Sequence, residues 1–279
     1  MERKIAIITG ASSGFGFLSA ISLAKQGYTV YATMRNLEKA VMYEEDHIPI
    51  EIRDLIHIHQ LDVTDESSVQ ELKDLVSSIG RADVLVNNAG FAGGGFCEEI
   101  TIQEYRTQFE TNVFGVMAVT QAVLPVMREQ GFGKIINMSS ISGRVGFPGV
   151  SPYVSSKFAL EGYSESLRLE MKPYGVQVAL IEPGSFKTNI WSSGKQVSEK
   201  SQQPSSPYAS YMERINKHLD ESKDDMGDPQ DVADLIVLLA QQNELKKLRY
   251  PVGKGVGFML KLKKWLPWNK WEREILKRL

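Results

Sequence analysis

The sequence predicts a doubly wound α/β fold, with a parallel sheet of about seven strands and helices on both faces. Short apolar runs alternate with segments of helical periodicity from residue 4 to residue 252, which is typical of βαβ units. A glycine-rich turn at 9–16 follows the first apolar run, at the place where a helix can bind a phosphate group. A chain of 279 residues is long enough for one large α/β domain.

Each element follows from a local pattern of residues. Strands are predicted where short apolar or β-forming runs occur, and helices where apolar residues recur every three or four positions. The predicted strands are 4–9, 28–34, 55–61, 83–87, 133–139, 175–182 and 249–252. The predicted helices are 14–26, 66–79, a long one within 101–130, 152–173 and 229–241. Asp228 and Pro229 form a typical N-cap and first-turn pair for the last helix.

The alternation of strands and helices fails after Pro183. Residues 189–228 are rich in Ser, Gln, Lys and Pro, with a weak helical pattern near 207–220. Such a long loop in a compact domain is usually functional or disordered. We expect a substrate lid here rather than a surface excursion. The predicted organisation is one domain over 1–255, which includes this lid, followed by a helical tail at 256–279.

Charge and composition exclude several classes of protein. The segment 241–279 holds 11 Lys and Arg against 3 Asp and Glu, a net +8, so the first 240 residues are at −10. A nucleic-acid binder would carry its positive charge on the main domain, so we expect no nucleic-acid partner. Cys97 is the only cysteine, which excludes an intrachain disulfide and a multi-cysteine metal site. No segment has the pattern of a signal peptide or of a membrane span, so a cytoplasmic location is expected.

The glycine-rich turn indicates dinucleotide binding. A glycine at its start permits a tight turn, and the later glycines allow close approach of the backbone and close helix packing. The N-terminus of the next helix offers free N–H groups to a pyrophosphate. The turn lacks the Gly-Lys-Ser/Thr ending of a P-loop. The residues expected to contact the cofactor are Gly10, Ser12, Ser13, Gly14, Phe15 and Gly16.

This glycine spacing, G-x-x-x-G-x-G, resembles that of the classical short-chain dehydrogenase/reductase family, in particular its retinol and 17-beta-hydroxysteroid dehydrogenase-like branch. The resemblance spans residues 4–188 and implies a Rossmann fold. It implies adenine contacts at Asp62 and Val63. It implies ribose contacts in the Asn87-Asn88-Ala89-Gly90 segment, at Asn88, Ala89 and Gly90. It implies closure over the nicotinamide by Pro183 and Gly184, with Thr188 following.

Ser140, Tyr153 and Lys157 resemble the catalytic residues of that family, and the chemistry of the side chains supports the resemblance. Tyr153 and Lys157 are at i and i+4 on one face of a predicted helix. Because an unperturbed tyrosine pKa is near 10, we expect the Lys157 ammonium and the oxidised nicotinamide to lower it. Lys157 can also donate hydrogen bonds to the nicotinamide ribose, so both residues are expected to contact the cofactor.

Ser140 ends a predicted strand at the carboxyl edge of the sheet, where open α/β folds bind ligands. Its hydroxyl can donate a hydrogen bond to a substrate carbonyl oxygen, whereas alternation along the strand should point Ser139 elsewhere. The family resemblance implies a fourth catalytic member, Asn112, which would hold a water that relays protons to Lys157.

The end of the second predicted strand indicates the cofactor. An acidic residue there would bind the ribose 2′-OH and repel a 2′-phosphate. This chain has Met34 in that place, followed by Arg35, and a guanidinium suits a phosphate. We therefore expect NADP rather than NAD. The alternative is that Arg35 stacks on the adenine or faces solvent.

These residues predict an enzyme that interconverts a carbonyl and an alcohol by hydride transfer, without a metal. The alternatives are a cofactor-binding sensor without catalysis and a peripheral-membrane enzyme that acts on lipids. A small hydrophobic substrate, steroid- or retinoid-like by resemblance, is expected because no Arg or Lys pair is placed to hold a carboxylate. Apolar residues in the loops expected over the nicotinamide support this, although core or lid packing explains them equally well. They are Phe91, Phe96, Val145, Phe147, Phe186 and Trp191.

The tail at 256–279 interleaves tryptophans and leucines with lysines and arginines, and Pro267 should divide it into two short helices. This pattern suits an interfacial membrane helix, and it equally suits a helix that docks on the protein itself. We expect docking near the lid, because the acidic main domain attracts a basic tail within about 10 Å. The family resemblance also implies a homodimer or homotetramer, formed through the helices within 101–130 and 152–173.

Overall fold

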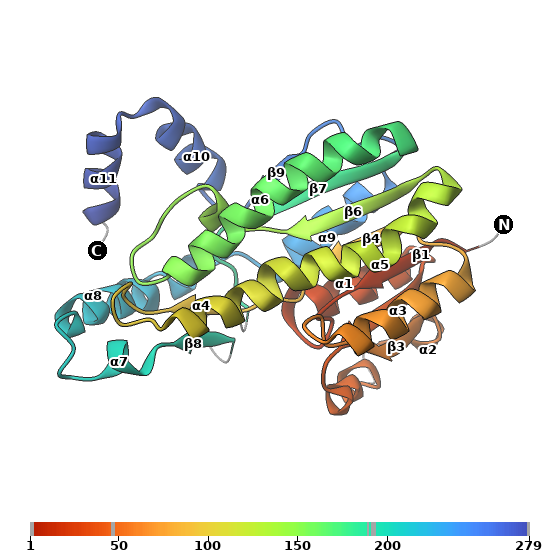
Figure 1. Cartoon of the computed structure of the whole chain (residues 1–279), viewed down its shortest axis with the longest axis horizontal. Coiled ribbons are helices and arrows are strands. Elements are labelled where there is room, and N and C mark those ends of the chain that lie inside the picture. The colour runs from red at the N-terminus through yellow and green to blue at the C-terminus, as the bar shows by residue number, and fades with distance from the viewer. Residues whose placement is uncertain (1–2, 46–47, 189, 191–193, 278–279) are drawn as a thin grey trace.

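The structure, a computed structural model, describes residues 3–45, 48–188, 190 and 194–277. Its centre is a seven-stranded sheet in the order β3-β2-β1-β4-β6-β7-β9, in which all neighbouring strands are parallel (Figure 1). This confirms the predicted doubly wound fold. The strands are β1 (Ile5–Ile8), β2 (Thr29–Met34), β3 (Ile56–Gln60), β4 (Val84–Asn87), β6 (Gly133–Met138), β7 (Val176–Pro183) and β9 (Arg249–Val252).

Helices cover both faces of the sheet and enclose two buried apolar clusters. One cluster joins the sheet to α1 and α9, and the other joins it to α3, α5 and α6. The central strands β1 and β4 are buried along their whole length, as parallel strands covered on both faces must be. The helices are α1 (Gly14–Lys25), α3 (Glu66–Ile79), α4 (Ile102–Phe109), α5 (Gly115–Gln130), α6 (Ser151–Met171) and α9 (Pro229–Gln241).

The predicted long helix within 101–130 is divided into α4 and α5 by a π-helical turn, Glu110–Phe114. A capping box between Thr101 and Glu104 begins α4. Such turns often occur at functional sites, and this one carries Asn112. Among the described residues, one stretch, Ile102–Gln130, is long and apolar enough to cross a membrane. Its α5 half packs on the sheet as a core helix.

Two short helical segments between β2 and β3 were not predicted. They are a 3-10 helix at Leu37–Tyr43 and α2 (Ile50–Arg53). The Asn36 side chain accepts a hydrogen bond from the N–H of Glu38 and thereby caps the first of them. Tyr43 then packs against Phe17 of α1 and donates a hydrogen bond to a carbonyl of the glycine-rich turn. Tertiary contacts therefore stabilise a segment whose own periodicity is weak.

The expected lid segment contains more structure than its composition indicates. It holds β8 (Lys195–Val197), α7 (Glu199–Gln202), α8 (Ala209–Glu221) and a 3-10 turn at Lys223–Asp225. Strand β8 pairs in parallel with β5 (Ala92–Gly94), outside the main sheet. The buried carboxylate of Glu99 accepts hydrogen bonds from Ser201 and Ser206, each at 2.6 Å. Phe96 stacks on Tyr208 with ring centroids 4.3 Å apart. These contacts attach the segment to the loop after β5.

The tail forms α10 (Val256–Trp265) and α11 (Trp268–Leu276) on either side of Pro267 (Figure 1). Val256 and the 3%-exposed Trp271 pack against Ile141 and Val145, in the segment that follows β6. Lys263 of α10 donates a hydrogen bond to the carbonyl of Arg144. The tail therefore packs on residues 141–147, whereas the expected place was the lid.

Candidate active site

A cavity of about 660 Å³ lies at the carboxyl edge of the sheet, where open α/β folds bind their ligands. Every residue predicted to take part in cofactor binding or catalysis lines it, except Gly16 and Asn112. The predicted residues that line the cavity are Gly10, Ser12, Ser13, Gly14, Phe15, Arg35, Asp62, Val63, Asn88, Ala89, Gly90, Ser140, Tyr153, Lys157, Pro183, Gly184 and Thr188.

The glycine-rich turn packs closely against the end of β4 and leads into a helix N-terminus that no described side chain caps. Gly10 has φ +66°, and a Cβ there would lie 2.7 Å from the Cα of Ala89. A Cβ on Gly16 would lie 2.5 Å from the carbonyl oxygen of Gly10, so Gly16 serves packing beneath the cavity. Among the described side chains, none caps the N-terminus of α1, and its first turn holds no acidic residue. The N–H groups of that turn are therefore free to bind an anion.

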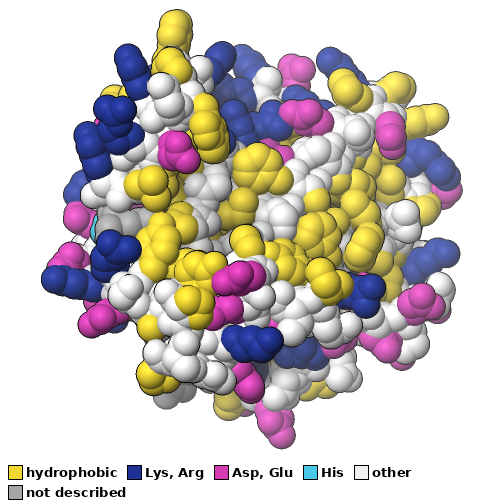
Figure 2. Space-filling view, turned by 60° about the vertical axis from the view of Figure 1, so that its left-hand side comes forward, with side chains coloured by type: hydrophobic (Ala, Val, Ile, Leu, Met, Phe, Trp, Pro, Cys, Tyr) yellow, Lys and Arg dark blue, Asp and Glu magenta, His cyan; other side chains and the backbone are white. Residues whose placement is uncertain are grey.

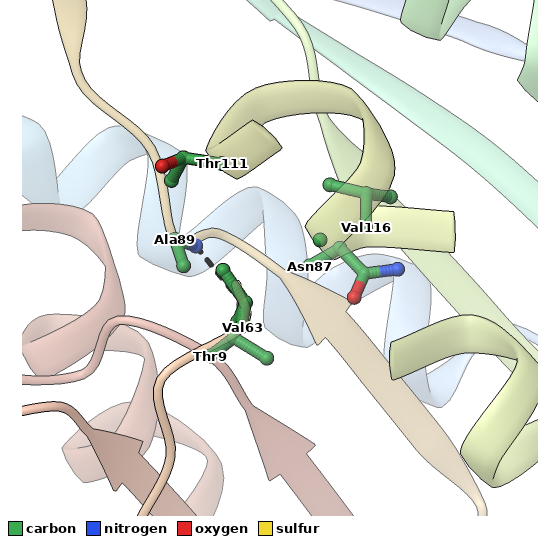
Figure 3. A pocket seen from close by; sticks show the side chains of 7 residues that line it. Thr9, Val63, Asn87, Ala89, Thr111 and Val116 are labelled. Carbon is green, nitrogen blue, oxygen red and sulfur yellow. Dashed lines mark hydrogen bonds between the residues drawn. The ribbon is translucent and has the colours of Figure 1, made fainter. Parts of the chain in front are cut away.

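The turn is held against the end of β4 by hydrogen bonds around Thr9. The Thr9 hydroxyl oxygen accepts from the N–H groups of Asn88 and Ala89, each at 3.0 Å. Figure 3 shows the bond to Ala89, with Val63 and Thr111 beside the small pocket that these residues line. The Asn88 amide donates in return to the carbonyls of Thr9 and Gly10, also at 3.0 Å. The two predicted cofactor motifs are thus fixed to each other.

The end of β2 forms the second part of the cavity. Met34 is buried, while Arg35 is exposed and lines the cavity. Lys39 lines the cavity as well, because the 3-10 helix that begins at Leu37 carries it back toward Arg35. Lys39 was not among the residues predicted to bind the cofactor. Its position, four residues after the basic Arg35, was the signal available in the sequence. The two cations face the same space, as binding of a phosphate group requires.

Ser140, Tyr153 and Lys157 are buried together in the third part of the cavity. The Lys157 ammonium donates to the carbonyl of Met138 at 2.7 Å and lies 5.6 Å from the centroid of the Tyr153 ring. The Ser140 hydroxyl oxygen accepts from the N–H of Ser142 at 3.1 Å. A side-chain hydrogen bond joins Ser140 to Tyr153. The helix α6 and the end of β6 therefore place all three side chains at one point.

Burial controls the ionisation of this group of residues. It raises the pKa of Tyr153 to about 12, and the hydrogen bond with Ser140 opposes this only in part. It lowers the pKa of Lys157 to about 8, against the influence of the Glu161 carboxylate. The predicted lowering of the Tyr153 pKa is wrong for the protein by itself, because desolvation disfavours the phenolate more than its neighbours favour it. Tyr153 is therefore a protonated acid at neutral pH.

Asn112 is fully buried in the π-helical turn and lies behind the cavity wall. Its amide nitrogen donates to the carbonyl of Phe91 at 3.1 Å and to the hydroxyl of Ser156 at 3.2 Å. Its amide oxygen accepts from the N–H of Phe91 at 3.2 Å. These bonds join α4–α5, α6 and the loop after β4, so Asn112 positions the cavity wall beside Tyr153. The second lone pair of its amide oxygen is left for another donor.

A family model described as short chain dehydrogenase matches residues 4–198. The chain belongs to the short-chain dehydrogenase/reductase family. It is therefore an oxidoreductase, and the family prediction from the motifs is confirmed. An uncharacterized oxidoreductase of Bacillus subtilis, YusZ, is 50% identical over 100% of this chain and 99% of its own length. A 3-ketodihydrosphingosine reductase of Bacteroides thetaiotaomicron is 39% identical over 96% of this chain and 95% of its own length.

Solved structures agree with this assignment. A short-chain dehydrogenase from Streptomyces avermitilis has a TM-score of 0.81 and 35% identity, and the match covers 98% of each chain. ElxO with NADP bound has a TM-score of 0.75 and 28% identity, with 92% of this chain and 100% of that chain covered. Both similarities extend well beyond residue 198, so the dehydrogenase shares most of its C-terminal part with these proteins as well.

Behind Lys157, this dehydrogenase has a buried charge network that its sequence motifs did not indicate. Glu161, one helical turn after Lys157, accepts from the Ser139 hydroxyl at 2.5 Å and from Arg249 at 2.7 Å. Ser139 thus directs its hydroxyl to Glu161, although the residue also lines the cavity beside Ser140. Buried Glu182 pairs with Arg144 at 3.0 Å and lies 3.5 Å from Arg249. The i, i+4 spacing of Lys157 and Glu161 was the signal available in the sequence.

The apolar residues expected around the substrate divide into three groups. Phe91 and Phe186 line the cavity. Phe96 instead packs on Tyr208 and Tyr211 of the lid segment, while Val145 and Phe147 pack on the tail. The expectation that these last three residues form the cavity wall is wrong, because lid and tail helices cover them. Trp191 lies outside the described residues.

The pKa of Lys157 predicts the pH dependence of the enzyme. If the Lys157 ammonium takes part in carbonyl reduction, as predicted, kcat/KM should fall as the pH rises through about 8. Glu161→Gln removes a negative charge that raises this pKa, so the falling limb should move to lower pH. Rates of NADPH oxidation across the pH range measure both effects. Glu165→Gln, a more exposed carboxylate one turn further along α6, is the matched control. If Glu161→Gln left the falling limb of the pH profile in place, or moved it to higher pH, the limb would not report the ionisation of Lys157.

Proposed function

We propose that this dehydrogenase reduces the carbonyl group of a hydrophobic substrate with NADPH, and catalyses the reverse oxidation with NADP. The observation that carries the proposal is the burial of Ser140, Tyr153 and Lys157 at one side of a cavity that Arg35 and Lys39 line at the other. Strands β1 and β4 separate β2 from β6 in the sheet. The two groups therefore lie about 14 Å apart, or three strand spacings, and a dinucleotide would extend across that part of the cavity.

NADPH supplies the hydride when it is bound. The Tyr153 hydroxyl, which its raised pKa keeps protonated, donates a proton to the carbonyl oxygen of the substrate. Ser140 donates a hydrogen bond to the same oxygen and thereby polarises the carbonyl group. The Lys157 ammonium stabilises the tyrosinate that results and binds the nicotinamide ribose. Asn112 holds the wall at Phe91, and its remaining lone pair binds the water that returns a proton through Lys157.

The choice of NADP over NAD follows from the residues at the end of β2. Arg35 and Lys39 line the cavity and Met34 is buried, so positive charge faces the position of a ribose 2′-phosphate. No acidic residue follows β2 directly to bind a 2′-OH. A relative of the same fold, ElxO, has been solved with NADP bound. The remaining contacts to the cofactor are assigned to the cavity-lining residues of the glycine-rich turn and of the loops after β3, β4 and β7.

The substrate class follows from the charges in the cavity. Among the described residues that line it, the basic side chains are Arg35, Lys39 and Lys157, all of which the cofactor and the catalytic group use. Arg144, in the segment after β6, is paired with buried Glu182. A carboxylate on the substrate would therefore lack a partner. The Bacteroides relative is named a 3-ketodihydrosphingosine reductase, and on that basis we propose a ketone or aldehyde on a long alkyl chain.

Three further features belong to the proposal. Residues 1–255 act as one catalytic domain in which 189–228 form the substrate lid, and 256–279 form a separate tail. The enzyme works as a homodimer or homotetramer in the cytoplasm. The helical stretch from α4 to α5 and helix α6 would form the subunit contact, because Ile102 of α4, Phe114 of the π-helical turn, and Phe158 and Leu169 of α6 are exposed.

A panel of carbonyl substrates tests the proposed function. With NADPH, a long-chain 3-ketone or alkyl aldehyde should have a kcat/KM at least about 100-fold above that of a 2-oxo acid, since the cavity offers the carboxylate no ion pair. NADPH consumption and product formation are measured together. Equal rates for the oxo acid would contradict the substrate class. Tight NADPH binding without turnover of any carbonyl would instead indicate a cofactor-binding sensor.

A further inference from the structure

The tail has one face on the protein and another in solvent. Trp271 and Val256 are buried against the segment after β6. Trp265 and Trp268 point the other way and are 81% and 69% exposed. Phe258 is also 69% exposed. Docking on the protein thus accounts for most of the apolar residues in α10 and α11, and it leaves Phe258, Trp265 and Trp268 largely exposed.

The exposed aromatic side chains alternate with lysines on one surface. Phe258, Lys261 and Trp265 are at i, i+3 and i+7, so they share one face of α10. Lys264 precedes Trp265, and Lys270 follows Trp268 at the start of α11; both lysines are exposed. In Figure 2 the side of the molecule that carries the tail faces forward. Hydrophobic side chains extend across it, and Lys and Arg side chains gather in the upper part of the view. We call Phe258, Lys261, Lys264, Trp265, Trp268 and Lys270 the tail surface.

The composition of the tail surface distinguishes between possible partners. Residues 256–279 hold seven Lys and Arg against two Glu, whereas the first 240 residues of the chain carry a net −10. If a second copy of the chain packed here across a two-fold axis, this patch would face itself, and its lysines would repel one another. Anionic phospholipid headgroups attract lysines, and the interface below them accepts the rings of tryptophan.

The tail surface also lies next to the proposed catalytic group. Helix α10 starts at Val256 and packs closely on Gly184. A Cβ on Gly184 would lie only 2.6 Å from the Val256 side chain. Gly184 lines the cavity. The same helix packs on the segment that begins directly after Ser140. Any partner that binds to the tail surface would therefore lie beside the cavity.

We propose that α10 and α11 dock the enzyme on an anionic phospholipid surface, with Phe258, Trp265 and Trp268 in the interface and the neighbouring lysines on the headgroups. A hydrophobic carbonyl compound then reaches the cavity from the bilayer. The second statement rests on the proposed function, whereas the membrane contact does not.

Sedimentation of the full chain with vesicles tests the membrane contact. The native protein should bind vesicles of phosphatidylcholine and phosphatidylglycerol in equal parts, and should bind phosphatidylcholine alone much more weakly. Trp265→Ser combined with Trp268→Ser should lower the partition coefficient by about 10- to 100-fold, because two interfacial rings are lost. Lys261→Gln combined with Lys264→Gln should lower it by about tenfold, with less dependence on salt.

Matched controls replace residues of similar exposure away from the tail. Ile50→Ser on α2 and Lys73→Gln on α3 should leave vesicle binding unchanged. Failure of the native protein to bind the anionic vesicles would overturn the proposal, as would unchanged binding of the Trp265/Trp268 variant. The native protein could instead fail to bind vesicles while the Trp265/Trp268 variant has half the native mass by light scattering. The tail surface would then be a contact between copies of the chain.

Two measurements separate this proposal from the proposed function. The Tyr153→Phe protein should bind vesicles as the native protein does, whatever its activity. Reduction of a short, water-soluble aldehyde should be unaffected in the Trp265/Trp268 variant, whereas reduction of a vesicle-borne long-chain ketone should fall with vesicle binding. Vesicle binding without any carbonyl reduction would preserve the membrane contact and remove the proposed function.

Discussion

Replacing Tyr153 with Phe should lower kcat for carbonyl reduction by about 1,000-fold, within the range that a positioned general acid contributes. The phenylalanine ring fills the same buried space beside Lys157, so the fold and the affinity for NADPH should change little. The hydroxyl that is hydrogen-bonded to Ser140 is the only group removed. Steady-state NADPH oxidation measures the loss, and fluorescence titration with NADPH measures the retained binding.

Tyr105→Phe is the matched control for this variant. Its hydroxyl lies 2.6 Å from that of Ser151 at the start of the same helix, α6, and Tyr105 does not line the cavity. This control should keep its activity within about threefold, as expected for the loss of a single peripheral hydrogen bond. If the Tyr153→Phe enzyme retained a tenth or more of the native rate, Tyr153 would not be the proton donor.

Arg35→Ala should weaken NADPH binding by about 10- to 100-fold, which is the effect of losing one or two charge-assisted hydrogen bonds to a phosphate. The affinity for NADH should hardly change, because NADH has no 2′-phosphate. Lys39→Ala should act in the same direction with a smaller effect, since a lysine contributes one point charge rather than a planar fork. The ratio of kcat/KM for the two cofactors measures the selectivity of each variant.

Lys25→Ala, at the exposed end of α1, is the control for a general loss of positive charge, and its cofactor ratio should equal that of the native enzyme. Met34→Asp combined with Arg35→Ala should raise the preference for NADH further, because a carboxylate at that position binds a ribose 2′-OH. Equal losses for NADPH and NADH in Arg35→Ala would mean that Arg35 contacts the adenine or pyrophosphate rather than the 2′-phosphate.

The order of elements could be predicted from the sequence because the strands and helices of the main domain differ in periodicity. Buried parallel strands such as β1 and β4 appear as short apolar runs, and the packed helices repeat apolar residues every three or four positions. The predicted and observed bounds differ by one or two residues in most of these elements. Segments stabilised by distant contacts were missed: the 3-10 helix after β2 depends on Phe17 and Tyr43, and β8 depends on pairing with β5.

The positions that line the cavity could be predicted for a related reason. Gly10 and Gly14 have positive φ angles, which glycine adopts more easily than other residues. Tyr153 and Lys157 share a helix face because of their spacing alone. Lys39 was missed because its place depends on how the segment after β2 turns back. Glu161 and Glu182 were missed because their partners, Arg144 and Arg249, are distant in the sequence.

The sequence by itself determined the order of strands and helices along the chain, the glycine-rich turn and the juxtaposition of Tyr153 with Lys157, because each depends on residues within a few positions of one another. Only the tertiary structure decided the ionisation of those two side chains and the partners of the tail. Burial raises the pKa of Tyr153 and lowers that of Lys157, and burial is a property of the assembled core. The packing of Trp271 on Val145, which leaves Trp265 in solvent, depends in the same way on surfaces that exist only once the chain is folded.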